Sequence, residues 1–374
     1  MPSAPTKLAL ALALLPVARS YPGFPQASLS AARHRNTSVL PSKPDQLTLV
    51  LAARVKDQGG FPRLTTLMRS LVLFLDAKMV ACMMLVVPDD DVPTFSEHAA
   101  FQGLPWPLRL VPDSQLLSHS ETQFERLTPT RERESHGGRG TNYRMQMLTK
   151  IGVSQLVSTS FYLVLDCDVI ATRHTTYADL VPGGRALIVG EQYPYHRHET
   201  RWWEAADEIL QAGGCVSRQA GRVIGVTPAL LATEVSRGLQ RYISEAQATT
   251  VEGAVEGWDE ALFRLRRYNL DWTEYTLYWT YACKAGLAEA MHTISALRLY
   301  EERYTCCHWR SSRLNPTLTL ILTLTLSSAF DWGAWHAWDA AAAFRDDSFV
   351  FTVIQSIGGV DPAWVDRTVA PFLA

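Results

Sequence analysis

The residues with the clearest capacity for chemistry are two aspartates, Asp166 and Asp168, separated by Cys167. They follow the apolar run Phe161–Leu165, which has the length and composition of a buried strand. Mg²⁺ and Mn²⁺ prefer oxygen ligands and commonly take one or two carboxylates together with substrate phosphates. A metal ion bound there would stabilise the negative charge that develops on a departing diphosphate. The spacing therefore predicts a site for a divalent cation and a phosphate-bearing substrate.

The same two aspartates leave other functions open. Haloacid-dehalogenase-like phosphatases also carry an apolar strand followed by two spaced aspartates, and Asp166 would then be the nucleophile, with 346–347 as a distal acidic pair. That strand normally opens its domain, whereas several predicted elements precede Phe161–Leu165 here. Val169 and Ile170 also stand where a glycine and a threonine usually follow. A non-catalytic carbohydrate-binding protein of the same fold is a third reading.

The elements that must position the aspartates alternate between strands and helices. Short apolar runs predict buried strands, and stretches with helical spacing of apolar residues predict helices between them. The first half gives strands at 47–53, 79–87, 108–111 and Phe161–Leu165, with helices at 61–75 and 143–157. The second half gives strands at 186–190, 222–226 and 349–354, and helices at 228–246, 258–267, 273–285 and 362–372. This order predicts an α/β fold with a mostly parallel sheet flanked by crossover helices. Ligands bind such sheets beyond the carboxyl ends of the strands, which is where the aspartates lie.

The chain divides into a short leader and one large domain. Residues 1–20 contain a lysine, a short apolar run and small residues at the end, as in a secretory signal peptide. The run is too short to span a bilayer, which needs roughly 20 apolar residues. Residues 21–45 read as a linker or stem, and 46–374 as a single domain. The alternating Thr/Leu segment at 315–326 has the low complexity of an insertion.

Composition narrows the partners and the compartment. The formal net charge is −2 and no run of Lys or Arg forms a basic stripe, so nucleic acid is not an expected partner. The leader predicts the secretory pathway, either the Golgi lumen or secretion, without a membrane-spanning helix. Six cysteines are present, and in that compartment one or two disulfides are expected, with Cys306 or Cys307 as candidates. The sequence does not give their connectivity.

Four segments together resemble a little-characterised family of GT-A-like glycosyltransferases. They are the Tyr-x-x-Gln-x-Leu-x-Lys helix at 143–150, the strand and acidic triplet at 162–168, the Glu-Tyr block at 272–278 and the segment 351–356. The order of these segments is similar and spans most of the chain. Thr273 replaces the usual serine of the third segment, and the Thr/Leu segment has no counterpart.

The resemblance implies a GT-A, Rossmann-like fold, a nucleotide-diphospho-sugar donor, and Mn²⁺ or Mg²⁺ as cofactor. The acceptor is a glycan, a protein or a small molecule. In such a protein Asp168 is the principal metal ligand, and Asp166 binds the metal or the donor ribose.

Other residues are candidates for donor binding and catalysis. Gln146 and Lys150 lie four positions apart, hence on one face of the predicted helix, where they would meet the donor, with Lys150 near the diphosphate. Arg54 follows the first strand, and Gln355 ends the last one. Glu274, at the start of a predicted helix, is the candidate base that takes a proton from the acceptor hydroxyl if the reaction inverts the sugar.

Overall fold

A computed structural model describes the following residues of the chain: 43–55, 61–127, 141–192, 197–216, 222–224, 227–247, 257–265, 272–300, 338–354 and 360–374. The leader at 1–20, nearly all of the linker at 21–45, the Thr/Leu segment at 315–326 and Gln355 lie outside these residues. Cys306 and Cys307 also lie outside them.

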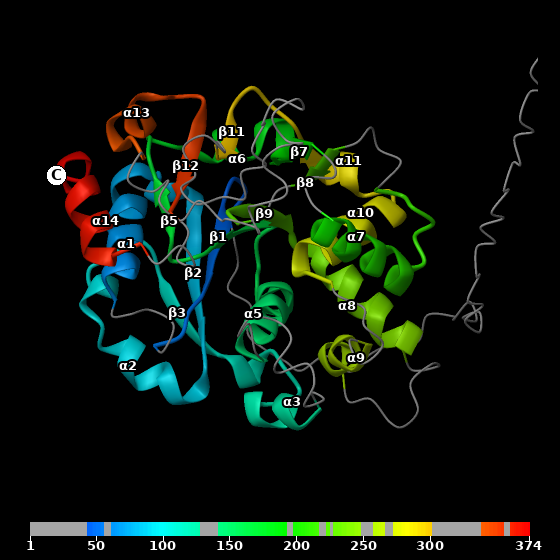
Figure 1. Ribbon diagram of the computed structural model, residues 1–374. Helices are drawn as coiled ribbons and strands as arrows, with labels where there is room; N and C mark the ends of the chain where they lie inside the picture. The colour runs from blue at the N-terminus through cyan, green and yellow to red at the C-terminus, as the bar shows by residue number, and fades with distance from the viewer. Residues whose placement is uncertain are drawn as a thin grey trace, which may run out of the picture.

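The centre of the molecule is a five-stranded sheet in the order β3-β2-β1-β4-β9 (Figure 1). Its strands are β1 (Leu47–Ala52), β2 (Val80–Val87), β3 (Leu108–Pro112), β4 (Phe161–Leu165) and β9 (Ala229–Ala232). The first four run parallel, and β9 is antiparallel to β4. All residues of β1 and β4 are buried. Unbroken burial is expected for parallel strands that are covered on both faces, and the predicted α/β class with a mostly parallel sheet is confirmed.

Helices cover the two faces of this sheet. On one side lie α1 (Pro62–Phe74) and α14 (Pro362–Val369), and on the other lie α5 (Thr141–Gly152), α8 (Thr233–Gln247) and α10 (Glu274–Lys284) (Figure 1). Pro62 opens α1, where its missing N–H has no helical partner to lose. The other α-helices among the described residues are α2 (Val92–Ser96), α3 (Glu121–Leu127), α6 (Tyr177–Leu180), α7 (Arg197–Leu210), α9 (Trp258–Leu265), α11 (Ala288–Met291) and α13 (Ala340–Arg345).

Smaller sheets extend from the central one. The strand β5 (Val169–Ala171) directly follows the acidic triplet and pairs antiparallel with β12 (Phe349–Val353), which in turn pairs with β11 (Arg298–Tyr300). Two further pairs join β6 (Ala186–Leu187) with β10 (His292–Thr293), and β7 (Gly190–Gln192) with β8 (Arg222–Ile224). The pairing of β5 with β12 brings the C-terminal part of the chain to the triplet.

The predicted helix at 228–246 is wrong over its first residues. Ala229–Ala232 forms β9, in which Leu231 lies opposite Tyr162 of β4, and the helix begins only at Thr233. Alanine and leucine favour helices, but the outer side of β4 offers unpaired backbone groups that β9 satisfies. Tertiary pairing therefore overrides local propensity at this position. The helix α7 was not predicted, although Trp203, Ala206 and Leu210 are buried at helical spacing.

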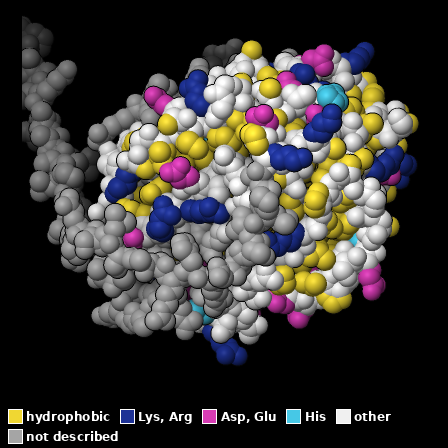
Figure 2. Space-filling model, turned by 180° about the vertical axis from the view of Figure 1, so that it is seen from behind, with side chains coloured by type: hydrophobic (Ala, Val, Ile, Leu, Met, Phe, Trp, Pro, Cys, Tyr) yellow, Lys and Arg dark blue, Asp and Glu magenta, His cyan; other side chains and the backbone are white. Residues whose placement is uncertain are grey.

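The surface carries charges of both signs. On the face seen in Figure 2, basic and acidic side chains alternate with apolar ones instead of gathering in one basic stripe. Among the helices of the described residues, none is long and apolar enough to cross a membrane.

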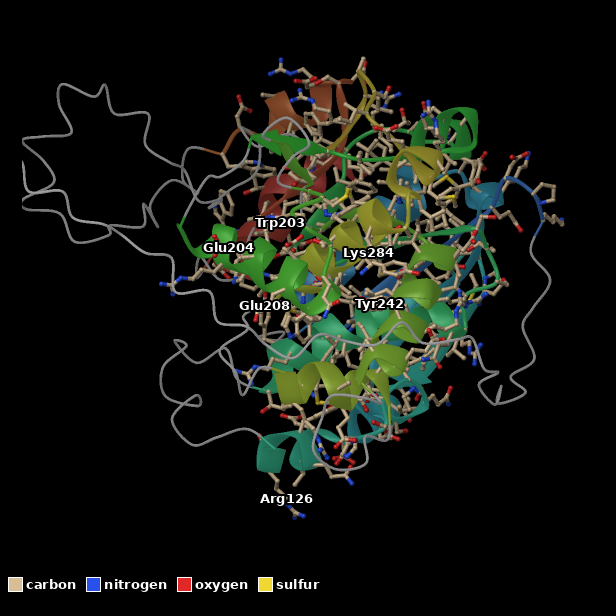
Figure 3. All side chains as sticks on the ribbon, turned by 90° about the vertical axis from the view of Figure 1, so that its right-hand side faces the viewer. Arg126, Trp203, Glu204, Glu208, Tyr242 and Lys284 are labelled. Carbon is tan, nitrogen blue, oxygen red and sulfur yellow. A yellow bond between two sulfur atoms is a disulfide. The ribbon has the colours of Figure 1, made fainter. Side chains whose placement is uncertain are left out.

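A disulfide joins Cys215, beyond the end of α7, to Cys283 in the last turn of α10, with 6.1 Å between the Cα atoms. Lys284 strengthens this junction, since its Nζ lies 2.6 Å from the Leu210 carbonyl oxygen and 3.0 Å from the Tyr242 hydroxyl (Figure 3). This pairing differs from the candidates Cys306 and Cys307. It links segments 68 positions apart, so it restricts a long loop in the unfolded chain.

Removal of this disulfide is expected to lower the free energy of unfolding by about 2–4 kcal/mol, because the unfolded chain regains the entropy of that loop. Denaturant unfolding of Cys283→Ala, Cys215→Ala and the double variant measures the effect. Each single variant breaks the same bond, so the double variant should be no less stable than the less stable single one. Additive losses would contradict the pairing.

Candidate active site

The candidate site lies where the order of the strands reverses. From β1 the chain proceeds outward through β2 to β3, then returns to place β4 on the other side of β1. Ligands of open α/β sheets bind in the crevice at the carboxyl ends of the two strands that flank such a switch point. Arg54 follows β1 and Asp166 follows β4, so both predicted residues lie at this edge.

Lys150 of α5 is the centre of a buried group of charges. Its Nζ lies 3.0 Å from Oδ1 of Asp166 and 3.2 Å from Oε1 of Glu274. The side chains of Lys150 and Glu274 are each 5% exposed, whereas that of Asp166 is 27% exposed. One buried ammonium therefore connects an inner carboxylate with a carboxylate that borders solvent.

Three neutral groups complete this network. Gln146 lies one turn before Lys150, and its Nε2 is 3.4 Å from Oδ1 of Asp166 and 3.5 Å from the Ala52 carbonyl oxygen at the end of β1. The Thr227 hydroxyl lies 3.4 Å from Lys150 Nζ and 2.6 Å from the Tyr275 hydroxyl. The prediction that Gln146 and Lys150 share one face of a helix is confirmed, and both side chains contact Asp166.

The location of Glu274 follows from how α10 begins. Thr273 caps the helix by accepting a hydrogen bond from the Thr276 N–H, which places Glu274 in the first turn. The partial positive charge of a helix N-terminus stabilises an anion there. Burial raises the pKa of Glu274, while the positive charge of Lys150 opposes that shift. Its Oε1 lies 3.2 Å from Lys150 Nζ, so the lysine offsets part of the cost of burying this carboxyl group.

The two carboxylates also determine the state of Lys150. Burial by itself would lower the pKa of the ammonium group, but the negative charge of Asp166 raises it, and Glu274 adds to the effect. The net result is a pKa well above that of a free lysine. Lys150 therefore stays charged at any physiological pH.

Asp168 lies two residues further along, and its position is fixed by the backbone. The triplet makes a tight turn in which the Val169 N–H donates to the Asp166 carbonyl oxygen at 3.1 Å. The Asp168 carbonyl oxygen accepts a hydrogen bond from the Ile354 N–H of the C-terminal segment at 2.9 Å. Asp166, Cys167 and Asp168 are all partly exposed. The turn therefore presents the triplet to solvent at the sheet edge while strands on either side hold its backbone.

Arg54 is at the same edge but is bound elsewhere. Its Nη2 lies 2.8 Å from Oε2 of Glu121 and 4.0 Å from the sulfur of Met145, the residue next to Gln146. The side chain is 13% exposed. Arg54 thus lies beside Met145 of α5, whereas Lys150 lies in the last turn of the same helix. Gln355 is outside the described residues and follows Ile354 directly.

Sequence reasoning missed a second acidic group at this edge. Asp89 and Asp91 follow β2, and Asp113 follows β3. Asp91 accepts a hydrogen bond from the Val55 N–H at 2.9 Å, and Asp89 binds the Ser114 hydroxyl at 2.7 Å. The position of these aspartates after predicted strands could have identified them, by the rule that located Asp166.

Asp113 is expected to make the stability of the protein depend on pH. Burial raises its pKa to about 7, the hydrogen bond and negative charge of Asp89 add to the shift, and Arg54 opposes it. An unfolded aspartate loses its proton near pH 4. Between pH 4 and pH 7, Asp113 therefore binds a proton in the native state but not in the unfolded state. Its contribution to stability falls as the pH rises through this range.

The free energy of unfolding of the wild type should therefore fall between pH 4 and pH 8 relative to that of Asp113→Asn, which carries no proton to lose at this position. The expected difference is about 1 kcal/mol, because Asp113 is partly exposed and solvent screens its interactions. Urea unfolding at the two pH values measures the change. The neighbouring exposed Asp90 supplies the control, since Asp90→Asn should follow the wild type at both. A constant difference between Asp113→Asn and the wild type would refute the assignment.

The oxygen atoms of the acidic triplet are of the chemical type that binds a hard divalent cation. Asp166 and Asp168 offer carboxylate oxygens, the ligands that Mg²⁺ and Mn²⁺ prefer. Within the described residues, no group of three or more His, Cys, Asp or Glu side chains could hold a metal ion. Two carboxylates at a solvent-facing turn are what such ions use when substrate phosphates supply the other oxygens.

Comparison with solved structures finds glycosyltransferases. Mouse xyloside xylosyltransferase 1 in its apo form is 10% identical, with a TM-score of 0.43, covering 84% of this chain and 100% of that one. Core-mannan synthase A from Aspergillus fumigatus, in a Mn/GDP form, is 9% identical with a TM-score of 0.43, covering 69% and 77%. The glycosyltransferase GlyE of Streptococcus pneumoniae is 15% identical with a TM-score of 0.28, covering 60% and 44%. TM-scores and identities this low carry no weight for the chemistry of this chain.

The sequence itself gives the assignment to a family. No curated protein matches it. Residues 44–374 match the family described as "Family of unknown function (DUF6492)", a stretch that includes the whole central sheet and every residue of the candidate site. The chain is therefore a member of the DUF6492 family.

Proposed function

We propose that this protein is a glycosyltransferase of the GT-A type that takes a sugar from a nucleotide-diphosphate donor with the help of Mn²⁺ or Mg²⁺. The observation that carries the proposal is the placement of Asp166 and Asp168. They lie at the carboxyl end of β4, beside the switch point of a parallel sheet, and a buried lysine holds the first of them. This arrangement supports a nucleotide-binding edge of the Rossmann kind.

The roles of the two aspartates differ in this proposal. When bound, the metal ion would neutralise the charge that develops on the diphosphate leaving group. Asp168 would hold the ion, because its backbone is fixed on both sides while its side chain belongs to a partly exposed turn. Both carboxylate oxygens of Asp166 lie near Lys150 Nζ, at 3.0 and 3.3 Å, and their remaining lone pairs would bind the ion or the donor ribose.

Lys150, Gln146 and Glu274 then act on the donor mainly through Asp166. The Lys150 ammonium is 5% exposed and already contacts two carboxylates, so a direct contact with the diphosphate would require it to leave one of them. We infer that its main role is to orient Asp166, with Gln146 as a second donor to the same carboxylate. Arg54, which follows β1, and Gln355, which lies outside the described residues, remain predicted donor-binding residues.

The prediction that Glu274 takes the acceptor proton remains a proposal. Its carboxylate is 5% exposed and faces Lys150 at 3.2 Å, which favours a role as counter-charge to the lysine. As a base it would have to release Lys150 and meet the acceptor hydroxyl. The two roles separate kinetically, since the loss of a base lowers kcat with little change in donor affinity, whereas the loss of a counter-charge disturbs Asp166 and weakens donor binding.

The secretory pathway is the proposed location. The Cys215–Cys283 disulfide supports it, because disulfides persist in oxidising compartments and are rare in the cytosol. The apolar run of the predicted leader at 1–20 also favours a secretory location. The acceptor would be a glycan, a protein or a small molecule of that compartment.

A thermal-shift screen of nucleotide-sugars tests the proposal. A ligand that binds only the native state raises the melting temperature, so at least one donor should raise it in the presence of Mn²⁺ and do so less with EDTA. Asp168→Asn is the comparison, and it should lose the Mn²⁺-dependent part of the shift. If no nucleotide-sugar shifts the wild type, or if the variant responds like the wild type, the proposal is wrong.

A further inference from the structure

The helix α1 presents two buried polar side chains to the strands that flank the acidic triplet. Arg63 and Ser70 lie seven positions apart, about two helical turns, and so share one face of the helix. Figure 1 shows α1 beside β5 and β12, on the opposite side of the central sheet from α5. Arg63 is 6% exposed and Ser70 is fully buried. Polar groups at such depth are retained where they make specific hydrogen bonds.

Arg63 binds the backbone on both sides of the connection that follows β12. Its Nη1 donates to the Ile354 carbonyl oxygen and its Nη2 to the Val360 carbonyl oxygen, each at 2.7 Å. The guanidinium group is planar and rigid, so the two bonds fix the positions of these carbonyls relative to each other. A lysine, with a single ammonium on a flexible stem, could not impose the same geometry.

The residue that Arg63 holds is bonded directly to Asp168. The Ile354 N–H donates to the Asp168 carbonyl oxygen at 2.9 Å, continuing the antiparallel pairing of β12 with β5. Only one residue, Ile354, therefore separates the Arg63 guanidinium from the backbone of Asp168. A shift of Ile354 would shift Asp168 with it.

Ser70 fixes the other end of the same short ladder. Its Oγ accepts a hydrogen bond from the Ala171 N–H at 3.0 Å and donates its own hydrogen to the Leu67 carbonyl oxygen at 2.8 Å. Ala171 ends β5, which begins immediately after Asp168. The helix α1 thus holds the end of β5 through Ser70 and the end of β12 through Arg63.

We propose that Arg63 and Ser70 are positioning residues that set the location of Asp168 for metal binding through the backbone of β12 and β5. This inference rests on the proposed function, in which Asp168 holds the divalent cation. Groups that orient metal ligands without touching the metal change metal affinity by about 10- to 100-fold when they are removed. Arg63 acts through the backbone, so the low end of that range applies.

Mn²⁺ binding tests the proposal without any sugar donor or acceptor. The probe is Mn²⁺ titrated into the full chain, followed by the electron paramagnetic resonance signal of the free ion, alone and with UDP or GDP. Arg63→Met is expected to raise the Kd for Mn²⁺ by about tenfold. Arg63→Lys should give an intermediate value, and Ser70→Ala a rise of a few-fold.

Arg237 supplies a matched control. This arginine of α8 also donates to two backbone carbonyls, those of Ser154 at 2.9 Å and Val157 at 2.7 Å, in the segment that links α5 to β4. Arg237→Met removes a bidentate arginine of the same kind and should lower the melting temperature similarly. Its Kd for Mn²⁺ should equal that of the wild type.

The outcomes separate this inference from the proposed function. If the wild type and Asp168→Asn bind Mn²⁺ equally or not at all, both ideas fail. If Asp168→Asn loses the ion while folded Arg63→Met binds it like the wild type, only the positioning role fails. Equal weakening by Arg237→Met would also overturn it, since the effect would then be general destabilisation. Should Arg63→Met not fold, Ser70→Ala decides, and an unchanged Kd there refutes the proposal.

Discussion

Lys150→Met is expected to lower the free energy of unfolding by about 3–5 kcal/mol, the range for removing one partner of a buried ion pair. Methionine fills much of the same volume, but the variant leaves the carboxylates of Glu274 and Asp166 without their shared cation. Glu274 is as deeply buried as Lys150, so it carries most of the loss. Denaturant unfolding monitored by circular dichroism measures the change.

A double variant separates charge from packing. In Lys150→Met with Glu274→Gln the buried negative charge is gone, so part of the stability lost in Lys150→Met should return, giving a coupling energy of about 1–3 kcal/mol. Lys284→Met is the surface comparison, because that lysine is exposed and donates mainly to backbone oxygens. It should cost about 1 kcal/mol. If Lys150→Met lowers the free energy of unfolding by no more than Lys284→Met does, the buried ion pair does not stabilise the protein as proposed.

Asp168→Asn is expected to reduce sugar transfer or donor hydrolysis by about 10²- to 10³-fold, the usual effect of removing one preorganised electrostatic contact from a transition state. The side chain is partly exposed, so the free energy of unfolding should change by less than about 1 kcal/mol. Activity and stability would therefore separate. Initial rates at saturating Mn²⁺, measured beside urea unfolding, show whether they do.

Asp347→Asn is the control for a general effect of removing an aspartate. Asp347 is exposed, and it is part of the acidic pair that a phosphatase of the haloacid-dehalogenase type would need. In a glycosyltransferase this variant keeps its activity. Loss of activity in Asp347→Asn, together with a phosphorylated Asp166 after incubation with a phosphate ester, would favour the phosphatase instead.

The elements that the sequence predicts well are those whose burial leaves a local pattern. β1, β2 and β4 are runs of apolar residues covered on both faces, and such runs are recognisable without knowledge of their neighbours. The parallel orientation of these strands is predicted because a helix connects one strand to the next. The location of Asp166 at the carboxyl edge was predictable for the same reason, because it needs only the end of one strand.

The contacts of the site depend on residues far apart in the sequence. Nothing local indicates that Lys150 meets Glu274, because their approach depends on how α10 packs against α5. β9 was likewise predicted as helix, since its partner β4 is the reason that it is a strand. Arg63 reads as an ordinary charge in the first turn of a helix, and only the tertiary fold brings Ile354 and Val360 to it.

Release of nucleoside diphosphate from a nucleotide-sugar, with and without Mn²⁺, tests the central claim most directly. The full chain is incubated with each donor that raises its melting temperature, and the free diphosphate is quantified for the wild type and for Asp168→Asn. The account predicts release that requires Mn²⁺, stops with EDTA and falls by at least about 10²-fold in the variant. Release that is independent of the metal, or equal in the wild type and Asp168→Asn, would contradict it.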